Sequence, residues 1–93
     1  MHKFQKTEVG FKAHYMYDEL ELYGVSDPIN ILYESPSEIM LEGKDKTMHF
    51  YIIVKEDEFT VLLDCNGSKE VTYFKHPQQV MKHLLIKQME VSE

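Results

Sequence analysis

The sequence predicts an α+β fold in which an antiparallel β-sheet is packed on one face by a C-terminal helix. Two runs rich in β-branched and aromatic residues flank Asn66-Gly67, the dipeptide most typical of a two-residue hairpin turn. A third such run precedes them across the polar segment KEDE. After Pro77, apolar side chains recur at helical spacing, and proline suits the first position of a helix.

The β-rich segments are expected to form a three-stranded meander. Its strands span residues 47–54, 59–65 and 68–74, and the helix spans residues 77–89. A two-residue turn fixes the register, so that Asp64 faces Lys69 and Leu62 faces Val71. Because side chains alternate between faces, one face of the meander is almost wholly apolar and suits the helix. The second face has an apolar centre and a polar end.

The first quarter of the chain permits two interpretations. Apolar and polar residues alternate along residues 9–17, which favours a β-hairpin that turns near Asp18. A helix over residues 11–23 is the alternative. Asp27-Pro28 is a further candidate for the start of a short helix.

The segment after residue 34 is also ambiguous. Ser35-Pro36-Ser37-Glu38 fits a helical capping box, and Gly43 suits the position just past a helix end. These signals predict a short helix at 36–42, with a strand through Ile39–Leu41 as the alternative. N-terminal strands would extend the meander, and residues 1–93 are expected to form one small domain.

The composition of the chain argues against several classes of function. The net charge is −6 and every basic residue is lysine, which argues against nucleic-acid binding through phosphate neutralisation. No apolar run approaches the ~20 residues that span a bilayer, and no signal peptide is evident, so we expect a cytoplasmic protein without membrane contact. The single cysteine allows no internal disulfide. No nucleotide-binding or metal-chelating motif occurs, so no cofactor and no metal are predicted.

One cluster of residues has side chains suited to catalysis. The register places His49 across from Asp64, and a histidine oriented by a carboxylate is the arrangement of a general base. Cys65 follows directly, but neighbouring residues of a strand point to opposite faces. A row of His49, Asp64 and Lys69 that fixes the register is therefore favoured. A small enzyme centred on His49, Asp64 and Cys65 is a minor alternative, and no catalytic residue is predicted.

The favoured function is a protein-binding module: a regulator, adaptor or inhibitor. Its candidate surface is the second sheet face, because tyrosine is enriched at interfaces. The predicted partner-binding residues are Tyr51, Ile53, Leu62, Val71 and Tyr73. The partner would be another protein or a second copy of the chain. The N-terminal half is, however, the favoured cover for this face, and an exposed sheet edge is another candidate interface. A further alternative is an acidic, phage-type inhibitor or nucleic-acid mimic that blocks a basic protein surface.

Overall fold

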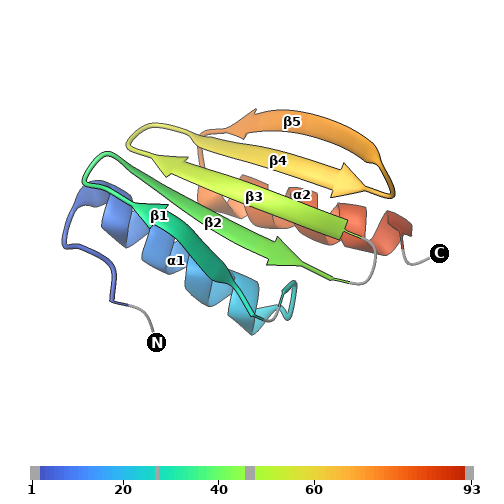
Figure 1. Ribbon diagram of the computed structural model, residues 1–93, viewed down its shortest axis with the longest axis horizontal. Helices are drawn as coiled ribbons and strands as arrows, with labels where there is room; N and C mark the ends of the chain where they lie inside the picture. The colour runs from blue at the N-terminus through green and yellow to red at the C-terminus, as the bar shows by residue number, and fades with distance from the viewer. Residues whose placement is uncertain (1–2, 27, 46–47, 92–93) are drawn as a thin grey trace.

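The computed structural model describes residues 3–26, 28–45 and 48–91, the side chain of residue 91 excepted. It shows one five-stranded antiparallel sheet, with the strands in sequence order, and two helices (Figure 1). The elements are α1 (Glu8–Leu22), β1 (Asn30–Glu34), β2 (Glu38–Lys44), β3 (Met48–Lys55), β4 (Phe59–Cys65), β5 (Ser68–Phe74) and α2 (Pro77–Val91). The predicted α+β fold, with its antiparallel meander and C-terminal helix, is confirmed; residue 47 lies outside the described residues.

The predicted register of the meander is also confirmed. Asp64 pairs with Lys69, and Leu62 pairs with Val71. The turn between β4 and β5 has φ values of 54° at Asn66 and 86° at Gly67, the positive values that a type I′ turn requires. This turn therefore sorts apolar and polar side chains onto the two faces of the sheet.

Helix α2 begins as its sequence predicts. Pro77 is its first residue, and the Gln79 side chain accepts hydrogen bonds from the backbone N–H groups of Lys75 and His76, at 3.1 and 3.2 Å. This is the half of a capping box in which the third helical residue reaches back. Val80 and Leu84 are fully buried against the sheet.

The hairpin predicted near Asp18 is wrong, and the helical alternative is correct. Helix α1 begins after Thr7, whose hydroxyl accepts a hydrogen bond from the Gly10 N–H at 2.9 Å. The apparent alternation gave weight to Phe11, which is 66% exposed. The α1 residues that pack into the core recur every three or four positions, which is helical spacing. They are Val9, Ala13, Met16 and Leu20, all fully buried.

The helix predicted at 36–42 is wrong, because this segment forms β2. The Ser35 hydroxyl does accept a hydrogen bond from the Glu38 N–H at 3.1 Å, as a helix cap would. The Ser35 N–H, however, donates to the Glu38 carbonyl at 2.9 Å, which closes a hairpin turn between β1 and β2. The alternative strand through Ile39–Leu41 is therefore correct.

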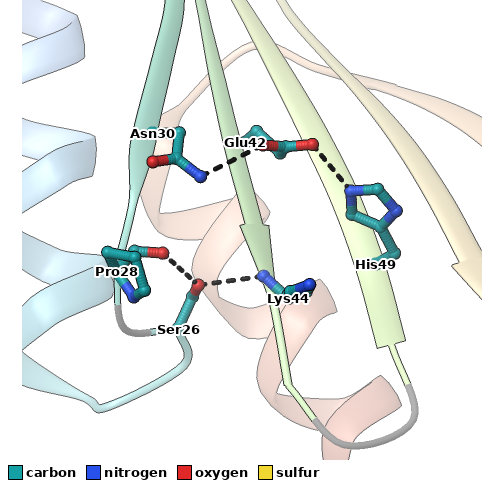
Figure 2. Close-up of polar contacts among 6 residues, drawn as sticks. All are labelled: Ser26, Pro28, Asn30, Glu42, Lys44 and His49. Carbon is teal, nitrogen blue, oxygen red and sulfur yellow. Dashed lines mark hydrogen bonds and ion pairs between the residues drawn. The ribbon is translucent and has the colours of Figure 1, made fainter.

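The connection between α1 and β1 is tied to β2. Pro28 leads into β1, so the helix start predicted at Asp27-Pro28 is wrong at Pro28, and Asp27 lies outside the described residues. The Ser26 hydroxyl donates to the Pro28 carbonyl at 3.1 Å and accepts from the Lys44 N–H at 2.9 Å (Figure 2). Gly43 does not follow a helix; it is a buried residue of β2 that lies against Ser26.

Both helices cover the same face of the sheet. Helix α1 packs on β2 and β3, α2 packs on β4 and β5, and the helices contact each other (Figure 1). The N-terminal half does not cover the second sheet face, contrary to the favoured expectation. A helix about 10 Å wide covers only part of five strands spaced about 4.8 Å apart. Two helices are therefore needed to bury one apolar face.

Candidate functional site

The face of the sheet opposite the two helices, here called the open face, is covered by no element within the described ranges. The strand pairing and the alternation of side chains assign its residues. From β1 to β5 they include Asn30, Tyr33, Glu38, Met40, Glu42, Lys44, His49, Tyr51, Ile53, Lys55, Thr60, Leu62, Asp64, Lys69, Val71 and Tyr73. All five residues predicted to bind a partner lie together on this face.

The centre of the open face is an apolar strip built from two rows that cross the strands. The first row is Tyr51, Leu62 and Val71, and the second is Met40, Ile53, Thr60 and Tyr73. Val71 is 53% exposed and Tyr73 is 62% exposed, whereas Thr60, inside its row, is 6% exposed. Apolar side chains of β5 are thus offered to solvent beside a well-packed centre.

A hollow of about 330 Å³ lies in the open face. Its apolar lining includes Tyr51, Leu62 and Val71, and its polar lining includes Asp64 and Lys69. A side chain that entered this hollow would meet both apolar surface and charged groups. The hollow therefore suits an amphipathic side chain better than a fully charged one.

The polar end of the open face is organised by Glu42. Its two carboxylate oxygens contact Asn30 Nδ2 at 3.2 Å and His49 Nε2 at 2.9 Å (Figure 2). These two hydrogen bonds hold the pKa of Glu42 below its usual value, and the one from His49 has the larger effect. The His49 ring also lies 4.8 Å from the Tyr51 ring, between centroids. Glu42 thus holds His49 at the border of the apolar strip.

The predicted His49–Asp64–Cys65 group does not converge. His49 and Asp64 are cross-strand neighbours, as expected, but the hydrogen bond of His49 goes to Glu42. Cys65 packs against the helix-covered core, and its desolvation raises the pKa of the thiol. The protonated thiol is a weak nucleophile. The geometry therefore gives these three residues no common site.

Sequence reasoning missed the part of the open face that belongs to β1 and β2, namely Tyr33, Met40 and Glu42. It failed there because the capping-box signal was assigned to a helix. The alternation of Glu38, Met40 and Glu42 with two buried aliphatic residues was the signal for a strand. Ser-Pro-Ser between two β-rich runs was the matching signal for a hairpin turn.

A second polar cluster lies under β5, on the helix-covered face. Glu70 contacts His83 Nε2 and Lys87 Nζ of α2, each at 3.3 Å. These contacts tie the sheet to the helix. Over residues 3–26, 28–45 and 48–91 there is no group of three or more histidine, cysteine or acidic residues placed to hold a metal ion.

No protein-family model, curated protein or solved structure matches this chain. Neither helix is long and apolar enough to cross a membrane, as far as the described residues extend.

Proposed function

We propose that this chain is a protein-binding module that acts through the open face. The observation that supports the proposal is the placement of both helices on one side of the sheet, which leaves the apolar strip on the other side without a covering element. Contiguous apolar patches rimmed by polar residues are typical of interaction surfaces. Five strands of about seven residues offer roughly 550 Å², so a partner that covered them would bury roughly 1,100 Å² in total, above the ~1,000 Å² of a specific interface.

The chemistry of the open face favours one kind of partner. The apolar strip is bordered by both signs of charge, with Lys44, Asp64 and Lys69 at one end and Glu38 and Lys55 at the other. A partner protein would place an amphipathic anchor such as tyrosine or tryptophan in the hollow. Lysines interspersed with carboxylates on this face favour such a partner over a strongly basic one, so the alternative of an acidic mimic gains no support from this surface.

Affinity capture from the source cell tests the proposal. We expect the tagged wild-type chain to retain a partner that Tyr51→Asp and Leu62→Asp lose, because each change places a charge in the apolar strip. Ile86→Asp is the matched control, since Ile86 is exposed on α2, away from the open face. The control should retain the partner. A partner that both open-face variants keep, while their circular dichroism stays native, would overturn the proposal.

Salt dependence separates the proposal from the acidic-mimic alternative. Burial of apolar surface persists as ionic strength rises, whereas binding to a basic surface weakens steeply. We therefore expect the captured partner to remain bound at high salt. Release of the partner by salt, together with insensitivity to Leu62→Asp, would favour an acidic mimic.

A further inference from the structure

We propose that two copies of this chain pair edge to edge through β5, in antiparallel orientation about a two-fold axis. The two sheets would then join into one, with both open faces on the same side. This pairing goes beyond the proposed function and does not require a second kind of protein.

The two edges of the sheet differ in their readiness to pair. Strand β1 has five residues, and its register with β2 shifts between Ile31 and Tyr33. The N-terminal segment also reaches this edge, because the Gln5 N–H donates to the Glu34 carboxylate at 2.9 Å. Strand β5 has seven residues in unbroken register with β4. A bulge protects an edge from further pairing, whereas a regular edge without proline invites it.

The backbone of β5 offers a free set of hydrogen-bonding groups. Next to a two-residue turn, Cys65 and Ser68 form a hydrogen-bonded pair, and such pairs alternate along an antiparallel ladder. The N–H and C=O groups of Lys69, Val71 and Tyr73 therefore point away from β4. Within the part of the chain that the structure describes, they have no hydrogen bond to another segment. A second copy of β5 would satisfy them.

The register of the pairing follows from charge. An axis at Val71 sets Val71 against its own copy and Lys69 against Tyr73 of the second copy. It would form about six backbone hydrogen bonds and place each ammonium beside an aromatic ring. Glu70, on the helix-covered side, would meet Thr72 and no carboxylate.

Other two-fold registers are less favourable. An axis at Lys69 or at Glu70 sets like charges directly opposite each other, which is destabilising. An axis at Thr72 or at Tyr73 sets Lys69 against Lys75 or Pro77, which lie beyond the end of β5. The Lys69 backbone groups would then have no strand partner, and the ladder would be shorter. Only the axis at Val71 pairs the three outward-facing residues without these defects.

Light scattering of the purified chain gives the first test. We expect a mass about twice the 11.0 kDa of one chain. Val71→Pro should return the mass to that of one chain and keep the native circular dichroism, because the Val71 N–H points outward and proline is tolerated at such an edge position. Thr72→Pro is the contrast: its N–H bonds to β4, so this variant should lose native structure. A wild-type chain that remains monomeric at every concentration would overturn the proposal.

Disulfide formation tests the register even if Val71→Pro fails to fold. In a Cys65→Ser background, Val71→Cys should form a disulfide between copies on mild oxidation, because paired Cα atoms lie about 5.5 Å apart. Tyr73→Cys should not, although Tyr73 is more exposed than Val71, since its Cα would lie roughly 14 Å from its copy. Equal cross-linking at both positions would overturn this register.

Leu62→Asp separates this pairing from the proposed function. Leu62 lies on β4, inside the open face and away from the β5 edge. The variant should lose the captured partner and keep the doubled mass. A monomeric, natively folded Leu62→Asp chain would show that the open face, and not the edge, joins the copies, and would contradict the inference.

Discussion

Replacement of Gly43 by alanine tests the packing that holds β2 against the α1–β1 connection. A Cβ at Gly43 would lie 2.5 Å from Phe50 Cζ, 2.7 Å from Ser26 Oγ and 2.8 Å from Ser26 Cβ. Phe50 is fully buried and Ser26 is 5% exposed, so neither has room to retreat. Gly43 therefore allows the side chains of Ser26 and Phe50 to approach β2 closely. The sequence pattern, by contrast, predicts that Gly43 lies just past the end of a helix.

Two opposing effects set the magnitude. An inserted methyl group in a filled core costs about 1–3 kcal/mol. Alanine also lowers the conformational entropy of the unfolded chain, which stabilises the folded state by about 0.4–1 kcal/mol. We therefore expect Gly43→Ala to lower the free energy of unfolding by about 1–2 kcal/mol. With a urea slope of about 1 kcal/mol per M, the midpoint should fall by about 1–2 M.

Urea unfolding followed by circular dichroism measures this change. A second variant, Gly43→Ala with Phe50→Leu, removes Cζ and relieves the closest contact. The losses of the two single variants should then exceed that of the double variant by about 0.5–3 kcal/mol, the usual range for residues in contact. A Gly43→Ala chain at least as stable as the wild type would refute this packing.

Three further predictions concern other parts of the chain. The pKa of Glu42 is lowered in the folded state. Glu42 therefore stabilises the fold above the ordinary glutamate pKa of about 4.3, and this stability is lost as the pH falls through the folded-state pKa. Glu42→Gln should make the free energy of unfolding fall less steeply in acid, and parallel curves for wild type and variant would contradict this. Burial raises the pKa of Cys65, so iodoacetamide at mildly alkaline pH should alkylate the native chain more slowly than the urea-unfolded chain, and equal rates would be the contrary result. Leu84→Ala should lower the free energy of unfolding by about 2–5 kcal/mol, whereas Ile86→Ala, at an exposed position, should change it by less than about 0.5 kcal/mol; similar losses in urea unfolding would show that α2 presents a different stripe to the sheet.

The sequence was most informative where local signals agreed with one another. Asn66-Gly67 sets a turn type, the turn sets a register, and the register sorts side chains onto two faces. The same agreement held for α2, where Pro77 and the apolar stripe indicate one helix. Five residues of the open face can therefore be assigned to one face from the sequence alone.

Local signals failed where one residue suits two structures. The Ser35 hydroxyl accepts the Glu38 N–H both in a capping box and in the observed hairpin turn, so local chemistry could not separate β2 from a helix. In α1, alternating aromatics resembled a strand, and Phe11 was given the same weight as residues that are buried. The burial of one face of α1 depends on contacts that are distant in sequence. Strands β1 and β2 widen the sheet, and α1 covers the part of its apolar face that α2 does not reach.

The claim that the open face of the sheet is uncovered can be tested at two neighbouring positions of β4. In a Cys65→Ser background, Leu62→Cys places a thiol on the open face, and Val61→Cys places one under the helices, where Val61 is 1% exposed. A maleimide should label the Leu62→Cys variant rapidly under native conditions. It should label the Val61→Cys variant only as fast as the chain unfolds, with strong acceleration in urea. Equal protection of both thiols in the native chain would contradict a bare face.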